Sequence, residues 1–207
     1  MTELISPQPL SGARCFGDGT PLYEQYHDTE WGLPVHGESA LYERITLEGF
    51  QSGLSWITVL RKRPAFREVF KDFDPEAVAA FTDDDVERLL EDARIIRNRS
   101  KIEATVGNAR ALVALHESGR SLDELFWSFA PDPSQRVARP AVWSDVPAHT
   151  PESKALSKAL KKAGFRFVGP TTMYAAMQAC GVVDDHLAGC PSVSQRAPGR
   201  SASGSTS

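Results

Sequence analysis

The sequence predicts an all-α fold. Apolar and polar residues do not alternate with a sustained period of two anywhere in the 207 residues, as they would in half-buried strands. Residues that typically begin and end helices recur along the chain, and residues 101–117 place apolar side chains on one stripe with helical spacing. With 41% apolar and 24% charged residues, the composition is that of a globular protein.

Two helix starts are predicted at Asp74 and Thr82. Asp74 is a suitable N-cap, and Pro75 follows at the first helical position, where its missing N–H is not needed. Thr82 and Asp85 have the spacing of a capping box, with Asp in place of the preferred Glu or Gln. Both signals favour short helices in this region.

The longest predicted helix covers residues 101–117, and Gly119 follows as its stop. A capping box formed by Ser121 and Glu124 then opens another short helix. The apolar stripe of the long helix consists of Ile102, Val106, Ala109 and Val113.

The last two predicted helices form a hairpin. The first runs from its cap at Thr150 to Lys162 and is ended by Gly164. The second begins near Pro170 and ends at Gly181. The turn between them is therefore short.

The length is sufficient for one core or for two closely packed lobes. We expect residues 13–192 to form a single unit, residues 1–12 to be a flexible N-terminus, and residues 193–207, which are poor in apolar side chains, to be a disordered tail. No apolar run is long enough for a membrane span, and the N-terminus lacks the pattern of a secretory signal. Because three sparse cysteines argue against a disulfide framework, we expect a cytoplasmic protein without a membrane partner.

Basic residues are segregated along the chain, although the net charge is −4. Residues 49–67 and 153–183 contain no Asp or Glu, and residues 95–101 add further Arg and Lys. Such segments would bind phosphates if they converged on one face. The alternative is a set of solvated helix faces.

The turn of the predicted hairpin is a candidate phosphate site. The second helix begins with Pro170 and Thr171 directly after Gly169, and its first backbone N–H groups have no partners within the helix. Lys161 and Lys162 flank the turn. A phosphate held in this way involves no base, so nucleic acid would be bound regardless of its sequence. The alternative is an ordinary helical hairpin.

A metal site is suggested near the C-terminal end of the predicted unit. His186 and Cys190 are four residues apart, which places both on one face of a helical turn. A closed zinc site needs four ligands. The chain has three cysteines and five histidines, and spacing alone does not single out the other two ligands.

Three stretches of the chain resemble a known family. FVGPTTMYAAMQACGVVDDH (residues 167–186) resembles the helix-hairpin-helix signature of the DNA glycosylase superfamily, in which a glycine-bearing hairpin precedes a helix and a "VD" element. CFGDGTPLYEQYHDTEWG (residues 15–32) and LEGFQSGLSWITVLRKR (residues 47–63) are similar to the 3-methyladenine DNA glycosylase I family. The resemblance runs from about Cys15 to Cys190.

This resemblance implies a helix-hairpin-helix DNA glycosylase fold of two closely packed helical lobes. It implies a monomeric enzyme of base excision repair that flips 3-methyladenine out of double-stranded alkylated DNA, hydrolyses its N-glycosidic bond and releases free 3-methyladenine, without lyase activity. It also implies one structural zinc ion that joins the termini, bound by Cys15, His27, His186 and Cys190. The alternative is a non-catalytic zinc-stabilised DNA-binding module, whereas a zinc hydrolase would require an open coordination position.

The resemblance also assigns residues to the base pocket. Flat rings suit the task because N3-methylated adenine in DNA is cationic and is attracted to electron-rich faces. A carboxylate can accept a hydrogen bond from the exocyclic amine of the base. Without the resemblance, the aromatic residues would indicate core packing and the glutamate a surface position. The implied base-binding residues are Tyr23, Tyr26, Trp31, Glu48 and Trp56, with Glu48 as the catalytic candidate.

DNA contacts are implied at two further places. A loop containing Gly53 and Leu54 matches the family's wedge, which enters the duplex and replaces lost stacking with an apolar side chain. The alternative is a buried turn. The hairpin contacts are Lys161, Lys162, Gly169 and Thr171.

Three positions depart from the pattern. Phe167 occupies the place of the hairpin's first glycine, and Gly17 stands where the family often has a tryptophan. Asp184 occupies the "VD" position, where related enzymes commonly carry asparagine. We expect Asp184 to cap a helix or orient His186, and the alternative is a carboxylate that assists departure of the base.

Overall fold

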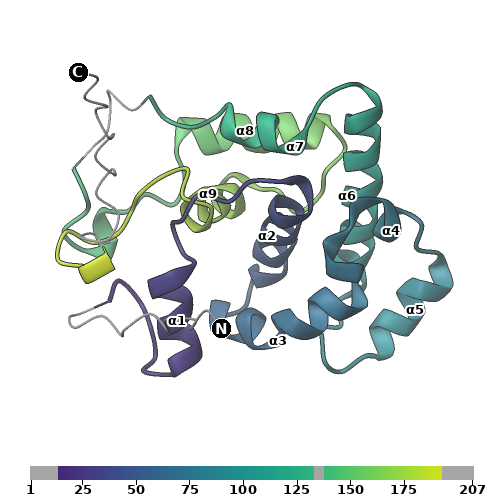
Figure 1. Cartoon of the computed structure of the whole chain (residues 1–207), viewed down its shortest axis with the longest axis horizontal. Coiled ribbons are helices and arrows are strands. Elements are labelled where there is room, and N and C mark those ends of the chain that lie inside the picture. The colour runs from purple at the N-terminus through teal and green to yellow at the C-terminus, as the bar shows by residue number, and fades with distance from the viewer. Residues whose placement is uncertain (1–13, 133–137, 193–207) are drawn as a thin grey trace, which may run out of the picture.

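The computed structural model describes residues 14–132 and 138–192, and the regular elements within these residues are all helical (Figure 1). This confirms the all-α prediction for the described part of the chain, whereas the predictions for residues 1–12 and 193–207 lie outside it. The α-helices are α1 (Pro21–Thr29), α2 (Glu38–Gln51), α3 (Trp56–Val69), α4 (Pro75–Ala79), α5 (Asp83–Glu91), α6 (Arg99–Glu117), α7 (Leu122–Trp127), α8 (Pro151–Lys162) and α9 (Pro170–Ala179). Two 3-10 helices are η1 (Lys71–Phe73) and η3 (Trp143–Asp145).

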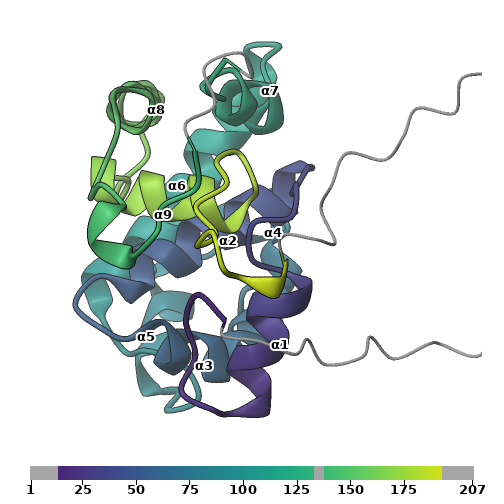
Figure 2. The same cartoon turned by 90° about the vertical axis from the view of Figure 1, so that its left-hand side faces the viewer.

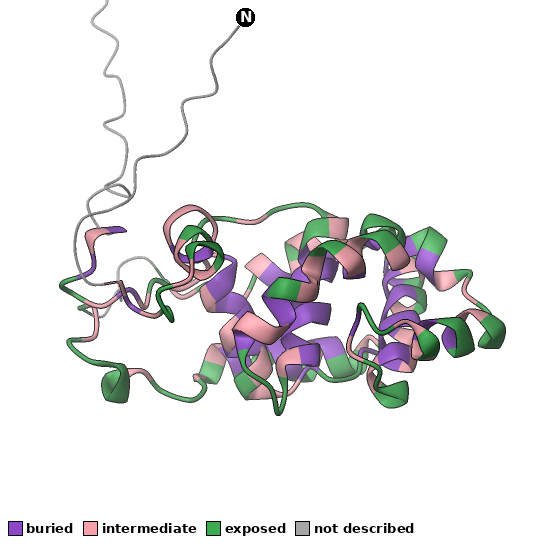
Figure 3. Cartoon of the chain, turned by 90° about the horizontal axis from the view of Figure 1, so that it is seen from below, coloured by how far each residue is buried: buried purple, intermediate pink, exposed green. Residues whose placement is uncertain are grey.

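Helix α2 is the centre of the fold. Residues 41–50 are buried without interruption, because α2 is contacted by α3, α6, α7 and α9. A helix buried on every side belongs to a core. In Figure 1, α4, α5 and α6 lie on one side of α2, and α1 and α9 lie on the other. Seen from below, buried residues line the inward faces of the helices (Figure 3).

The predicted helix starts are confirmed. Asp74 caps α4, Ser121 caps α7 and Thr150 caps α8, each by accepting a hydrogen bond from a backbone N–H of the first turn. Thr82 and Asp85 form the reciprocal capping box at the start of α5. These starts were predictable because every partner lies within three residues.

The long helix differs from its prediction at its start and in its apolar stripe. It begins at Arg99, because the Asn98 side chain accepts a hydrogen bond from the backbone of Lys101 at 3.1 Å and acts as the cap. Near its end the stripe passes through buried Leu112, and Val113 is only partly buried. From Ala109, a step of three residues leads to Leu112 and a step of four leads to Val113, and both steps fit helical periodicity. The packing of the neighbouring helices therefore decides which of the two side chains is buried. The buried predicted members are Ile102, Val106 and Ala109.

The end of α9 is attached to the segment that follows α1. Gly32 donates a backbone hydrogen bond to the carbonyl of Ala179 at 3.2 Å. A Cβ at Gly181 would lie 2.7 Å from the carbonyl carbon of Leu33, so this close approach requires glycine. The attachment fixes α1 against α9.

The two ends of the described chain meet beside α1 (Figure 2). The backbone N–H of Leu187 donates a hydrogen bond to the sulfur of Cys15 at 3.2 Å. Ala188 donates to the carbonyl of Pro140 at 3.0 Å, so the segment between α7 and α8 joins the same assembly. In the described part of the chain, no helix combines the length and the hydropathy that a membrane crossing requires.

Candidate active site and metal centre

A cavity of about 210 Å³ opens between α1, α2, α3 and α9. All five residues predicted to bind the base line it, so the fold brings them together as the sequence predicts. Five others were not predicted to bind the base: Phe16, Gln51, Trp143, Ala175 and Gln178. Gln51 could have been found, because it lies three residues after Glu48 on one helix.

The walls of the cavity are aromatic. Tyr26 and Trp56 have ring centroids 5.3 Å apart, and both side chains are buried. The ring of Phe16 lies 5.1 Å from Tyr23 and 5.0 Å from Trp31, edge-on to the latter. These contacts fix the rings in place, so the cavity presents preformed flat surfaces to a planar ligand.

Glu48 is the acidic group of this cavity. Its side chain belongs to the buried part of α2, with only 5% of the residue exposed. Burial raises the pKa of Glu48 to about 8, and the positive charge of Arg44, one turn earlier, opposes this only partly. No hydrogen bond within residues 14–132 and 138–192 engages its carboxyl group. The group is therefore available to a ligand that donates a hydrogen bond.

Tyr26 is supported from outside the cavity by two arginines. The guanidinium carbons of Arg44 and Arg63 lie 5.8 Å and 5.9 Å from the centroid of its ring. Glu30 accepts hydrogen bonds from Arg63 at 2.6 Å and 2.7 Å and from Arg44 at 3.0 Å. The hydrogen bonds to Glu30 hold both cations beside the ring of Tyr26.

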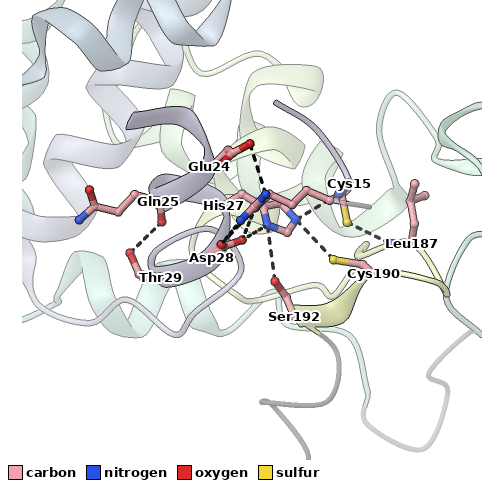
Figure 4. Close-up of polar contacts among 10 residues, drawn as sticks. Cys15, Glu24, Gln25, His27, Asp28, Thr29, Leu187, Cys190 and Ser192 are labelled. Atoms are coloured by element: carbon pink, nitrogen blue, oxygen red, sulfur yellow. Dashed lines mark hydrogen bonds and ion pairs between the residues drawn. The ribbon is translucent and has the colours of Figure 1, made fainter. Parts of the chain in front are cut away.

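Beside the cavity lies a buried group that can hold a metal ion. Ligand atoms of Cys15, His27 and Cys190 all lie within 4.8 Å of one another (Figure 4). The Nε2 atom of His27 accepts a hydrogen bond from the backbone N–H of Cys15 at 3.2 Å, and its Nδ1 faces Asp28 at 2.8 Å. The structure thus assembles three of the four predicted ligands.

The fourth predicted ligand, His186, is adjacent to these three. Its ring centroid lies 5.5 Å from that of His27, and its Nδ1 faces the carboxylate of Asp184 at 2.8 Å. Each imidazole is therefore oriented by a carboxylate at Nδ1, which leaves Nε2 as the nitrogen that carries the lone pair. Thiolates and imidazoles oriented in this way suit zinc and similar metals.

Asp184 is held away from the cavity lining. One of its oxygens bonds His186, and the other accepts hydrogen bonds from Arg139. Burial raises the pKa of Asp184, but the hydrogen bonds from His186 and Arg139 outweigh it, and the pKa lies well below its usual range. The geometry matches the expected role of orienting His186.

The predicted hairpin connects α8 and α9. Its turn is clamped by Asn108, whose side chain bonds the backbone N–H and carbonyl of Arg166 at 2.7 Å and 3.0 Å. Phe167 adopts a φ of 57°, the left-handed conformation that glycine usually supplies, at a cost of about 1 kcal/mol. Phe167 therefore adopts the backbone conformation of the glycine that it replaces in the family pattern. The Phe167 side chain is exposed.

The start of α9 is partly exposed. Gly169 is its N-cap, and no side chain of the described residues caps the first N–H groups of α9. Thr171, Lys161 and Lys162 are exposed around it. A phosphate seat at this helix start is compatible with the geometry.

The loop between α2 and α3 presents an apolar tip. Gly53 has a φ of 83°, and the neighbouring Leu54 is 42% exposed. Lys101 donates hydrogen bonds to the carbonyls of Phe50 and Ser52 at 2.9 Å and 2.7 Å, which fixes the base of this loop. The alternative of a buried turn is therefore wrong.

Most basic residues of the segments 49–67 and 95–101 are engaged within the protein. Lys62 bonds the carbonyls of Ala93 and Arg94, and Arg67 pairs with Glu43. The same holds for Arg61, Arg63, Arg99 and Lys101. These cations are thus held by contacts within the protein, and the choice between a phosphate surface and solvated helix faces stays a prediction for these segments.

Comparison with known proteins gives a consistent result. The family model described as methyladenine glycosylase matches residues 16–193. DNA-3-methyladenine glycosylase 1 of Escherichia coli (strain K12) is 52% identical over 170 residues, which cover 82% of this chain and 90% of that protein. DNA-3-methyladenine glycosylase of Haemophilus influenzae is 48% identical, with coverage of 82% and 91%.

Solved structures show the same similarity in three dimensions. A crystal structure of 3-methyladenine DNA glycosylase I superposes with a TM-score of 0.82 at 50% identity, covering 86% of this chain and 98% of that one. The Staphylococcus aureus enzyme, whose structure addresses 3-methyladenine recognition, superposes with a TM-score of 0.80 at 37% identity, covering 86% and 94%. The chain therefore belongs to the methyladenine glycosylase family.

Proposed function

We propose that this chain is a monofunctional DNA-3-methyladenine glycosylase of base excision repair. The observation that carries the proposal is a buried carboxyl group, Glu48, inside a preformed aromatic cavity, in a chain that is 52% identical to DNA-3-methyladenine glycosylase 1 of Escherichia coli. Its substrate is double-stranded alkylated DNA, and its product is free 3-methyladenine. A non-catalytic DNA-binding module has no use for such a cavity.

The side chains account for base selection in physical terms. The N3-methylated base is cationic, so it is attracted to the faces of Tyr26 and Trp56 and to the carboxylate of Glu48. Its positive charge favours the ionised form of Glu48, which then accepts a hydrogen bond from the exocyclic amine. An unmodified adenine lacks this charge and binds more weakly.

The chemical step needs little further assistance. A cationic leaving group already has a weak glycosidic bond, and binding that favours the flipped, departing base lowers the barrier further. Lyase activity requires an amine nucleophile, and no lysine occurs among the described residues that line the cavity. We therefore expect water to be the acceptor of the sugar.

Release of the base from alkylated duplex DNA tests the proposal. Incubation with the protein should yield free 3-methyladenine, identified by chromatography, and an uncleaved abasic strand. DNA binding without release of any base would favour the DNA-binding module, and strand cleavage at the abasic site would contradict the absence of lyase activity.

We further propose that the metal site holds one structural zinc ion. Cys15, His27, His186 and Cys190 supply two thiolates and two imidazoles, the donor set of a closed tetrahedral site. Four protein ligands leave no position for a water molecule, so the ion would act by joining the two ends of the fold rather than in hydrolysis.

Residues 13–192 would then act as one folded unit, which we propose to be a cytoplasmic monomer. The three cysteines Cys15, Cys180 and Cys190 are all free thiols, which suits a reducing compartment. Two of them serve the metal site in this proposal.

We propose that DNA is held by the hairpin and by the loop tip. The start of α9, with Gly169 and Thr171, would bind a phosphate, with Lys161 and Lys162 beside it. Leu54, with Gly53 at the turn, would enter the duplex at the place that the flipped base leaves.

Neutralising the hairpin lysines should weaken DNA binding without changing damage selectivity. In the Lys161→Gln/Lys162→Gln variant, affinity for damaged and undamaged duplexes should fall alike. The negative slope of log K against log salt concentration should become shallower, by about 2. A control that replaces two exposed cations outside the hairpin, Lys71→Gln/Arg120→Gln, should retain the parental slope. A loss confined to damaged DNA would contradict the assignment.

Asp184→Asn should retain most activity. The amide oxygen can still accept the hydrogen bond from His186 Nδ1, and the group does not line the cavity. Single-turnover excision measures the outcome, with metal content determined in parallel. A loss of more than about a hundredfold, roughly 2.7 kcal/mol of barrier, with the metal retained would instead identify Asp184 as a catalytic carboxylate.

A further inference from the structure

The cavity contains an aromatic residue that its sequence position does not reveal. Gly17 supplies no ring, and a Cβ built there meets no atom within 4 Å. Trp143 lines the cavity instead, although it belongs to η3 in the connection between α7 and α8. It shares the cavity lining with Phe16.

We propose that Trp143 is a specificity-determining residue that closes the open side of the base pocket and contacts the flipped base. Its ring lies 6.2 Å from that of Trp31 and 6.4 Å from that of Phe16, so it continues the aromatic wall. It is 40% exposed, unlike buried Trp31 and Trp56. A ring at the cavity mouth that is still partly hydrated gains most when a planar ligand covers it.

The Trp143 ring is fixed by a direct hydrogen bond. Its indole N–H donates to the backbone carbonyl of Cys15, which determines the orientation of the ring plane. The turn that carries it is closed by Asp145, whose carboxylate accepts from the backbone N–H groups of Ala141 and Val142 at 3.2 Å and 3.3 Å. A ring held in this way loses little conformational entropy when the base binds.

The segment that precedes Trp143 is anchored to the C-terminal part of the structure. Arg139 bonds the carboxylate of Asp184, and Pro140 accepts the hydrogen bond from Ala188 at 3.0 Å. The segment is therefore attached on one side to Cys15 and on the other to the neighbours of His186. These hydrogen bonds fix the position of the segment beside the cavity.

The inference rests on the proposed function, because it takes the ligand to be a methylated adenine. In Trp143→Leu the flat surface is lost and the mouth widens. Affinity for free 3-methyladenine should fall about tenfold, as is typical for loss of one base–aromatic stack. Discrimination against a larger alkylated base, 3-methylguanine, should become weaker. Trp143→Phe keeps a ring and should retain most of the affinity.

Calorimetric titration of the full chain with free 3-methyladenine, alongside binding to an undamaged duplex, tests the proposal. Val142→Ala serves as the control, because Val142 is an exposed neighbour in the same turn that does not line the cavity. A selective loss of base affinity in Trp143→Leu, with duplex binding, melting temperature and metal content at parental values, is the expected result.

Two outcomes would overturn the proposal while the proposed function stands: unchanged base affinity in Trp143→Leu, or an equal loss of base affinity, duplex binding and thermal stability. A parental protein that neither binds nor excises 3-methyladenine would overturn the proposed function itself, and the role of Trp143 with it. The activity of the parental protein therefore distinguishes the two failures.

Discussion

Glu48→Gln should lose excision of 3-methyladenine by at least about a hundredfold while making the protein more stable at alkaline pH. Glutamine keeps the size of the side chain but removes the charge that the cationic base favours. It can still accept one hydrogen bond, so the loss should appear in excision more than in DNA binding. The same substitution should therefore lower the rate of excision and raise the stability at alkaline pH.

The stability effect follows from the pKa of Glu48. The folded protein binds this proton more tightly than the unfolded chain does, because the pKa is about 8 against an ordinary value of 4.5. The free energy of unfolding therefore falls as the pH rises from about 4.5 to about 8, by about 1.4 kcal/mol for each pH unit at most. A glutamine has no proton to lose, so the variant should melt higher than the parent at pH 9 and at a similar temperature near pH 4.

Excision should also depend on this ionisation. The kcat/KM of the parent should rise with pH until Glu48 is ionised near pH 8, and the residual rate of the glutamine variant should lack that rise. Glu43→Gln is the matched control, since Glu43 is buried on the same helix, pairs with Arg67 and does not line the cavity. Parental excision by Glu48→Gln would disprove the assigned role.

If the proposed zinc site is right, Cys190→Ser should fail to bind zinc and should lose much of the fold's stability. Removal of one thiolate leaves three buried ligands that no longer close the coordination sphere, and the affinity of a structural zinc site is part of the folding free energy. Fresh, unchelated parental protein should contain one zinc ion per chain. Metal analysis and the melting temperature measure the change.

Cys180→Ala provides the comparison, because Cys180 is another buried thiol but lies outside the metal group. This variant should keep its metal and lose only the stability that comes from packing a small core side chain. Zinc-free parental protein, or a Cys190→Ser variant with unchanged metal content and melting temperature, would contradict the structural zinc site.

Local signals in the sequence predicted much of the fold. The caps at Asp74, Thr82 and Thr150 were predictable because each interaction spans only three residues. The choice of Leu112 over Val113 for the core was not, since it depends on which face the neighbouring helices cover. Residues far away in the sequence therefore determine which of two helical positions is buried.

The same distinction applies to the site. Resemblance to the family identified Tyr23, Tyr26 and Glu48, which lie in motifs with characteristic spacing. It did not identify Trp143, because nothing in its local sequence places η3 over the cavity; contacts to Cys15 and to the C-terminal segment do. For the same reason, the carboxylates that pair with Arg63 and Arg67 could not be foreseen from an acid-free stretch.

The hydrogen bond between Leu187 and Cys15 joins residues 172 positions apart in the sequence. Closing so long a loop carries a large entropic cost, and contacts of this range form slowly. During synthesis, α1 leaves the ribosome well before its partners at the other end of the chain exist. We therefore expect the aromatic cavity to be completed only after residues 175–187 have left the ribosome, and a nascent chain that ends before these residues to be unable to recognise a damaged base.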